Sequence, residues 1–533
     1  MSVATFPSPR SDTPDFRLSR RFFLQCSVAA AAFGSANLAH AQEAAAFSFD
    51  LLTDQARENA SRNYAPAVRP SGFLGTLDYD AYRLIRFRND RALWSNSESP
   101  WRLHAFHTGW LFGDPVTLFE VQDGISMPVI FSTADFEYLE GLAEAVPADA
   151  ELPGIAGFRL NAPLNHPARF DEVISFLGAS YFRALGRDSR YGLSARGLAL
   201  NTAGPAPEEF PRFSRFYFER DPQNAQIVTI YALLDGPSVS GAYRMVMRPG
   251  TVTEIEVTAR LFFRAEVTEL GIAPLTSMFL FSGLNRAGFD DYRPKVHDSD
   301  GLRIVQPGGD VIWRPLNNPA RLAGSYFAET SPLSFGLHQR DRDFSSYEDA
   351  GARYDRRPSL DVVPLGDWGP GFVRLVEIPT DLEINDNIVA YFIPEGTITA
   401  GHSREFSYLL RWGDLPLDPG SDLAHISETR AGIGGVSGVE LPTDERKFVI
   451  DFTGGLLSRL GPDETTEVAP VVSVAGGELV YATLEKVEGT DIWRLVVDVT
   501  AGSDGIVELS AHIAGFGRKL SEIWLNQWIA VDE

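Results

Sequence analysis

The stretch Asp290–Leu302, DDYRPKVHDSDGL, gathers four aspartates with one histidine, one lysine and one arginine. Side chains of these types can ligate calcium, exchange protons with a substrate, or form a polar turn. The calcium interpretation rests on the sequence DSDG from Asp298 to Gly301. A complete calcium loop has a further acid two positions earlier, where Val296 stands, and a closing Glu that is missing here. We therefore expect no metal, and an acid–base site and a polar turn both remain open.

A second candidate is Ser194, in the sequence YGLSARG. A nucleophile elbow requires G-x-S-x-G at a turn from a strand into a helix. Here an additional residue separates Ser194 from the following glycine, and no strand–helix alternation surrounds it. We interpret Ser194 as a structural residue. No other motif indicates a cofactor.

Composition limits the classes of function. The chain has 533 residues of which 44% are hydrophobic, enough for a large core, and its length favours two domains because single cores seldom exceed about 300 residues. The formal net charge of −24 would repel a phosphate backbone, which argues against nucleic acid as a partner. No segment is apolar and long enough to predict a membrane span.

The N-terminus is typical of an export signal. Arg20 and Arg21 precede a short apolar run that ends in Ala-His-Ala at Ala41. Paired arginines in this position are typical of the twin-arginine route, so residues 1–41 are predicted to be a signal peptide and the protein to be periplasmic. Cys26, the single cysteine of the chain, would leave with that segment. The mature protein would then contain no disulfide.

The remaining chain predicts an all-β protein. One helix is expected near residues 49–64, with Asp50 as its N-cap, and a second, short helix within residues 170–186. Elsewhere, alternating segments such as QIVTIYALL and EIEVTARLFFRAEV predict strands. A segment rich in Pro, Gly and Asp at 414–425 predicts a linker between a large antiparallel sandwich at 42–413 and a smaller immunoglobulin-like sandwich at 426–533.

Several long motifs together resemble one family. They are LDYDAYRLIRFR, FLGASYFRALG, YGLSARGLALNT, DDYRPKVHDSDGL, RRPSLDVVPLGDWGPGFVRLVEIPT and DNIVAYFIP. The chain is identified through them as a member of the osmoregulated periplasmic glucan biosynthesis proteins G and D, and its paired arginines are more similar to the D branch. The resemblance implies a large carbohydrate-binding, mutarotase-like β-sandwich followed by an immunoglobulin-like domain.

The resemblance also implies a chemistry. Members of the family act on the β-1,2-glucan backbone of periplasmic glucans by anomer-inverting hydrolysis or by a cyclising transglycosylation. Carried over to this sequence, the general acid falls on Asp386 in EINDNIVAYF, and the general base falls on Asp298, acting through water and Tyr354. These residue types suit inversion, since one carboxylic acid protonates the departing oxygen while a second carboxylate activates water. The opening stretch is then the turn that carries the base.

An alternative function stays open. A non-catalytic scaffold that binds glucan and assists its export and branching would need none of the three catalytic residues. The resemblance names the β-1,2-glucan chain as a partner in either case, and the inner-membrane glucan synthesis machinery as a further candidate partner. Asp361 and Val363 depart from the family pattern, which has an aromatic residue and a Glu at these positions, so the sugar subsites are not assigned from the sequence.

Overall fold

The computed structural model describes residues 44–95, 97–417, 421–435, 438, 444–461 and 467–530. The predicted signal peptide, 1–41, lies outside these residues, as do residues 418–420 of the predicted linker. In the described ranges no helix is long and apolar enough to cross a membrane.

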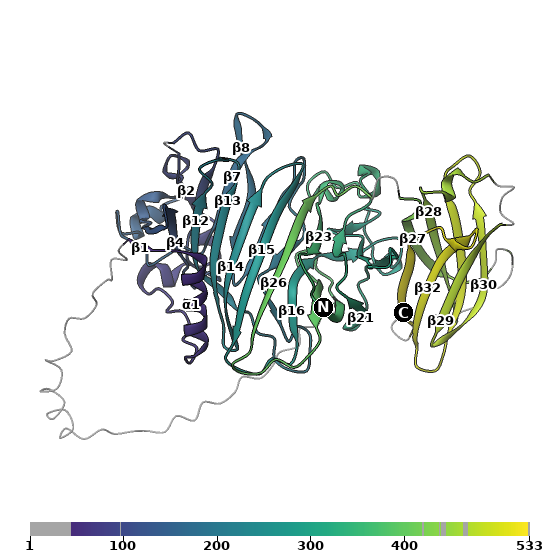
Figure 1. Ribbon diagram of the computed structural model, residues 1–533. Coiled ribbons are helices and arrows are strands. Elements are labelled where there is room, and N and C mark those ends of the chain that lie inside the picture. Colours follow the sequence, from purple (N-terminus) through teal and green to yellow (C-terminus); the bar gives the residue numbers. More distant parts are fainter. Residues whose placement is uncertain are drawn as a thin grey trace, which may run out of the picture. The chain divides into compact units, whose positions relative to one another are not determined.

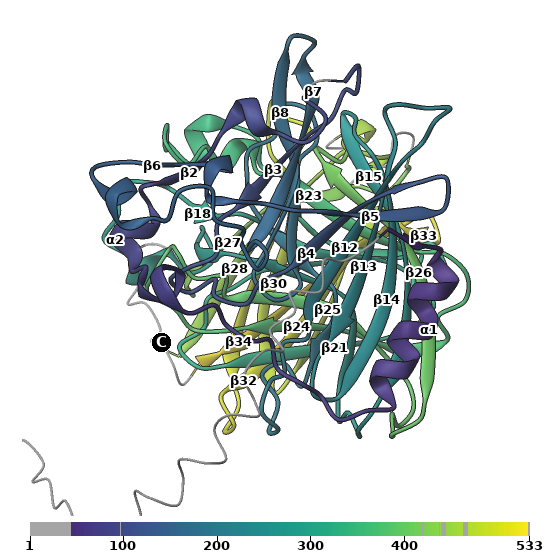
Figure 2. The ribbon, with the colours of Figure 1, turned by 90° about the vertical axis from the view of Figure 1, so that its left-hand side faces the viewer.

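The predicted N-terminal helix is confirmed as α1 (Phe49–Ala60). Its N-cap is Ser48 and not Asp50: the hydroxyl of Ser48, on extended backbone, accepts the Leu51 amide at 3.2 Å, while Asp50 occupies the first turn. Leu52 and the small Ala56 are buried on the face of the helix that packs on the protein. They pack against Phe119, Tyr217 and Tyr231 of the large sheet, and α1 lies along two strands of that sheet, β14 (Val239–Arg248) and β15 (Val252–Phe263) (Figure 2).

Strands form the rest of the architecture. The described residues form a large sheet of 16 strands. In spatial order these are β1 (Ala45–Ala46), β5 (Ile125–Val129), β4 (Thr117–Gln122), β12 (Arg212–Arg220), β13 (Val228–Asp235), β14 (Val239–Arg248), β15 (Val252–Phe263), β26 (Ser403–Gly413), β23 (Ser359–Pro364), β22 (Ser334–His338), β19 (Gly301–Val305), β20 (Val311–Pro315), β34 (Ile523–Ile529), β32 (Ile506–Gly515) and β29 (Val468–Ala475), with β33 (Arg518–Lys519) paired to β32. Figure 1 shows β12, β13, β14, β15 and β26 side by side. Long antiparallel pairs such as β14 with β15 dominate it.

The second sheet carries most of the candidate site. Its ten strands, in the described chain, are β21 (Ala323–Thr330), β24 (Pro370–Glu377), β25 (Ile388–Pro394), β16 (Leu270–Ser277), β10 (Ser194–Arg196), β9 (Tyr181–Ala184), β8 (Arg169–Leu177), β7 (Gly157–His166) and β3 (Arg102–Phe106) in spatial order, with β11 (Ala199–Leu200) paired to β16. Two short pairs stand apart from both sheets: β17 (Phe279–Phe281) with β18 (Val296–His297), and β2 (Ile85–Phe87) with β6 (Phe136–Tyr138). A one-turn helix, α2 (Tyr79–Tyr82), precedes β2.

The two large sheets pack face to face through aromatic side chains. Phe158 of β7 stacks on Phe176 of β8 at a centroid distance of 5.0 Å. It also meets Phe216 and Phe218 of β12, in the other sheet, edge to face at 4.8 and 4.9 Å. This shared core confirms the prediction of an all-β, antiparallel sandwich.

One element was predicted wrongly. Residues 170–186 form strands β8 and β9, not a short helix. Val173, Ile174, Phe176 and Phe182 are all buried in the inter-sheet core. Apolar residues at these spacings also fit a helix face, but aromatic packing across the sandwich decides for the strand.

The C-terminal strands enclose a core of their own. In the part of the chain that the structure describes, a sheet of four strands packs on β34, β32 and β29; its strands are β27 (His425–Ile433), β28 (Glu445–Thr453), β31 (Trp493–Ala501) and β30 (Gly477–Lys486). Trp493 and Trp524 are buried in this core. β34 also pairs in parallel with β20, so the large sheet continues into the C-terminal part. The division into domains at 414–425 stays a prediction, since contacts group residues 44–533 into one compact unit.

A buried ion pair gives a test of how the C-terminal strands are held. Both terminal guanidinium nitrogens of Arg340 donate to the carboxylate of Glu522, at 2.8 and 2.7 Å, and the two side chains are 7% and 5% exposed. Because Glu522→Ala leaves Arg340 buried without its partner, we expect it to lower the free energy of unfolding by about 3–5 kcal/mol. Urea unfolding measures this. The matched control is Asp114→Ala, which removes an exposed pair with Arg69 and should cost no more than about 1 kcal/mol. Equal losses in the two variants would contradict the prediction.

Candidate functional site

The stretch Asp290–Leu302 contains β18 and the turn into β19. Its glycine, Gly301, is required by packing: a Cβ at this position would lie 2.4 Å from the ring of Trp313. Asp300 is held by the protein, because its carboxylate accepts the backbone amides of Arg340 and Asp341. Asp300 and Gly301 of the calcium-like motif therefore each have a role in the fold. Within the described ranges, no group of three His, Cys, Asp or Glu side chains could hold a metal.

Asp298 is the buried acid of this turn. Its backbone amide donates to the carbonyl of Met278 at 2.8 Å, and its side chain is 10% exposed. The Nε of Arg357 lies 3.3 Å from Oδ1. Burial raises the pKa of Asp298 to about 6; the cation of Arg357 opposes this rise and the charge of Asp386 adds to it. Asp298 can thus gain or lose a proton near neutral pH.

Tyr354 begins a short 3-10 helix, Tyr354–Arg356, and is 1% exposed. Its hydroxyl donates a hydrogen bond to the carboxylate of Glu383, and its ring lies 5.2 Å beneath the guanidinium carbon of Arg357. Burial, followed by the bond to Glu383, raises the pKa of Tyr354, and the charge of Asp298 contributes to the same rise. The phenol therefore lies within electrostatic reach of Asp298 and keeps its proton.

Arg293, which belongs to the stretch Asp290–Leu302, holds Glu383 in place. Arg293 contacts its two carboxylate oxygens at 3.2 and 2.9 Å, and also binds Asp291 and Asp349. These three carboxylates raise the pKa of Arg293, with Asp291 as the largest cause, although burial opposes them. Arg293 thus ties the segment that contains Glu383 to the turn that carries Asp298.

Asp386 lies at the entrance to β25, on a segment that Asn387 anchors. The amide side chain of Asn387 is buried, accepts the backbone amide of Phe279 at 2.8 Å and donates to the Phe279 carbonyl at 2.9 Å. Asp386 itself is more open: its side chain is 30% exposed, and Oδ2 lies 3.5 Å from Nη2 of Arg183 on β9. The acid is therefore accessible to solvent while its backbone is held firmly.

The structure brings the three predicted catalytic residues into one cluster. The charges of Asp386 and Glu383 both raise the pKa of Asp298, and the charge of Arg183 opposes them, so each of these three groups lies within electrostatic reach of Asp298. Sequence reasoning did not find Arg183, Arg357 or Arg293. The signal for Arg183 in the sequence is a cation between the apolar residues Phe182 and Ala184, an alternation that fits a strand.

The structure also locates Ser194 and Asp361, two residues discussed from the sequence. Ser194 lies inside strand β10, not at a strand-to-helix turn, and its hydroxyl exchanges a 2.8 Å hydrogen bond with Thr276. Asp361, which departs from the family pattern, is buried and contacts Nε2 of His338 at 2.7 Å. Both residues serve the packing of the strands they belong to.

The fold and the cluster define a large β-sandwich protein whose acidic and basic side chains gather at the ends of strands from distant parts of the chain. Comparison with known proteins names the family: residues 47–528 match the model described as "Periplasmic glucan biosynthesis protein, MdoG". The chain belongs to this family.

Three relatives illustrate the similarity. The "Glucans biosynthesis protein G" of Cereibacter sphaeroides is 58% identical, with 98% of this chain and 99% of the relative covered. The protein of the same name from Rhodopseudomonas palustris is 41% identical, with coverages of 92% and 95%. The "Probable glucans biosynthesis protein D" of Shewanella oneidensis is 38% identical, with coverages of 98% and 96%. These identities do not support the prediction that the chain is nearer to the D branch, which rested on arginines outside the described residues.

Proposed function

We propose that this protein cleaves or rearranges β-1,2-glucan by inversion, with Asp386 as the general acid and Asp298 as the general base. The observation that carries the proposal is the cluster itself. One open carboxyl and one buried carboxyl come together with Tyr354 and three arginines, although the chain supplies them from separate strands and loops. Two carboxyl groups in different environments are what acid–base cleavage of a glycosidic bond requires.

The assignment of roles follows from access. A general acid must touch the oxygen that it protonates, whereas a base can act through water. Asp386, 30% exposed, can reach a glycosidic oxygen; Asp298, 10% exposed behind Arg357, needs an intermediary. Its raised pKa, taken alone, is the property of a proton donor, and would favour the reverse assignment. We give the exposure of the two carboxyl groups more weight than the pKa of Asp298, because an acid that cannot contact the leaving oxygen cannot protonate it, whatever its pKa.

The proposed reaction conserves atoms and protons. The carboxyl of Asp386 gives its proton to the glycosidic oxygen as the bond from that oxygen to the anomeric carbon breaks. A water molecule, or a hydroxyl of the same glucan in a cyclising transfer, attacks the anomeric carbon from the opposite face. Its proton passes through ordered water and Tyr354 toward Asp298. Exchange with solvent then returns each carboxyl to its starting state.

The proposal extends to location and partners. Export by the twin-arginine route would bring the mature chain to the periplasm, where the glucan chain and the inner-membrane synthesis machinery are its proposed partners. The family description and the names of the relatives, which refer to periplasmic glucan biosynthesis, support this part of the proposal.

The direct experiment incubates the purified mature protein with linear β-1,2-glucan, resolves the products by size and follows the anomeric configuration of new ends by NMR. Shorter chains with newly formed α ends support inverting hydrolysis, and ring products support transfer. Binding of glucan without any product in either form would instead identify the non-catalytic scaffold.

A further inference from the structure

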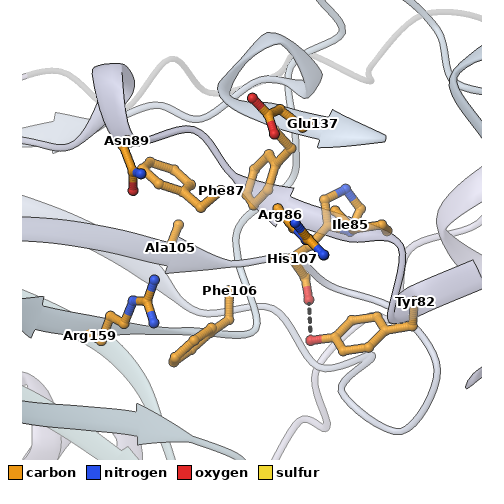
Figure 3. A pocket seen from close by; sticks show the side chains of 11 residues that line it. Tyr82, Ile85, Arg86, Phe87, Asn89, Ala105, Phe106, His107, Glu137 and Arg159 are labelled. Atoms are coloured by element: carbon orange, nitrogen blue, oxygen red, sulfur yellow. Dashed lines mark hydrogen bonds between the residues drawn. The ribbon is translucent and has the colours of Figure 1, made fainter. Parts of the chain in front are cut away.

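A cavity of about 460 Å³ lies away from the catalytic cluster, between the small β2–β6 pair and strand β3 (Figure 3). Part of its lining is apolar and comes from half-buried or buried side chains that include Phe87, Phe106 and Phe136. Its rim carries the exposed side chains of Arg86 and Glu137. Arg86 and Glu137 are direct cross-strand neighbours, so β2 and β6 together hold one cation and one anion at the opening.

This composition fits a neutral sugar. The apolar faces of a pyranose pack on aromatic rings, while its hydroxyls can both donate to a carboxylate and accept from a guanidinium. A phosphate or carboxylate ligand would meet the repulsion of Glu137. The other guanidinium of the lining, Arg159, is already paired with the carboxylate of Glu172 at 3.2 Å, and burial lowers the pKa of the lining residue His107 to about 4.

A row of side chains connects the cavity with Arg183, the residue that contacts Asp386. On adjacent strands of the ten-stranded sheet, His104 pairs with Arg159, Arg159 with Ser175, and Ser175 with Arg183. Their strand neighbours, such as Phe158 and Phe182, point into the core between the sheets. All four members of the row therefore lie on the opposite face of the sheet.

The row from His104 to Arg183 is longer than a single sugar, so it could contact several units of a glucan chain. From β9 to β3 there are three strand intervals, roughly 14 Å at the usual spacing within a sheet. Arg159 belongs to both features: it is in the row and lines the cavity. The Nε of Arg159 is buried without a hydrogen-bond partner among the described residues. A chain that lies along this face could therefore reach the cavity with one end while another part contacts Asp386.

We propose that the cavity binds a glucosyl unit of the same β-1,2-glucan chain, several units from the bond that Asp386 cleaves. This inference rests on the proposed function for the identity of the sugar. It also assigns a role to the motif LDYDAYRLIRFR, which contributes Tyr82, Ile85, Arg86 and Phe87 to the cavity and no residue to the catalytic cluster. The cavity then selects long chains, because a short oligosaccharide at Asp386 does not reach it.

The test compares affinities in a background that cannot cleave the chain, Asp386→Asn. Phe106→Ala removes an aromatic wall of the cavity and Arg86→Ala removes a rim group. Each should weaken the binding of long linear β-1,2-glucan about tenfold and leave the binding of a β-1,2-linked trisaccharide unchanged within about twofold. The matched control is Phe516→Ala, which removes an exposed ring from the turn between β32 and β33. Calorimetry gives the affinities, and melting curves show that each variant is folded.

The outcomes separate this inference from the proposed function. If both cavity variants are folded and bind long glucan as tightly as the control, the inference is wrong, even where the unmodified protein cleaves glucan. If long-chain affinity falls as expected although the unmodified protein yields no products, the cavity is a glucan site and the catalytic proposal fails. The same calorimetry with inorganic phosphate forms a further arm. If the cavity variants lose phosphate binding while their binding of glucan is intact, the cavity is an anion site and the inference is wrong.

Discussion

Replacement of Asp386 by asparagine should lower the turnover of β-1,2-glucan by at least about a hundredfold, because general acid catalysis contributes roughly 10²–10⁴ to a rate. Asparagine keeps the shape of the side chain but has no proton to give to the leaving oxygen. Its backbone should stay in place, since Asn387 and not Asp386 anchors the segment to Phe279. Glucan affinity and melting temperature are therefore expected to be nearly unchanged. Rates, affinities and melting curves measured on the same preparations check this.

A second substrate makes the result specific to an acid. A β-1,2-gluco-oligosaccharide whose reducing end carries a nitrophenyl group releases a phenolate that needs little protonation. The Asp386→Asn variant should therefore recover most of its activity on this substrate while remaining slow on glucan. Near-normal turnover of glucan by the folded variant would contradict the acid assignment and would favour the scaffold. Equal loss on both substrates would show that Asp386 acts in some way other than by protonation.

Much of the fold follows from local patterns. Alternation of apolar and polar residues predicts long strands such as β13 and β15, and helical spacing predicts α1, because each of these buries one continuous face. The helix predicted at 170–186 shows the limit of such patterns. Its apolar spacing fits both conformations, and the decision depends on rings such as Phe216, which belong to the opposite sheet. Pairing with distant strands cannot be read from a local window.

The site was predictable only in part, and for a different reason. The resemblance supplied Asp298, Tyr354 and Asp386, and the structure places them within one electrostatic cluster. The cations of that cluster are Arg183, Arg357 and Arg293, and they come from a strand, a loop and a turn that lie far apart in the chain. Arg183 in particular stood in the segment mistaken for a helix. Residue types indicate which groups can exchange protons, but their pKa values depend on neighbours that only the tertiary structure supplies.

Replacement of Asp298 by asparagine should also reduce turnover by at least about a hundredfold, but without the selectivity expected for Asp386. If Asp298 receives the proton of the attacking water, the variant lacks a base whatever group departs. Glucan and the nitrophenyl substrate should then be affected alike. Recovery on the nitrophenyl substrate alone would instead make Asp298 the acid. The half-buried Arg357 loses its carboxylate partner in Asp298→Asn, so a melting curve and a glucan affinity for this variant are needed alongside the rates.

The pH dependence of the unmodified enzyme tests the same assignment without a mutation. Burial raises the pKa of Asp298 to about 6, and a base must be deprotonated before it can accept a proton. Below this pH the carboxyl is protonated in the free enzyme, so kcat/KM for glucan should fall about tenfold per pH unit and reach its plateau above about pH 7. The reverse role gives the reverse sign, because an acid with this pKa would lose its proton, and the enzyme its activity, as the pH rises through 6. In Asp298→Asn, kcat/KM should no longer fall as the pH drops below about 6. If the same fall in kcat/KM persists in this variant, it belongs to another group, and Asp298 is not the base.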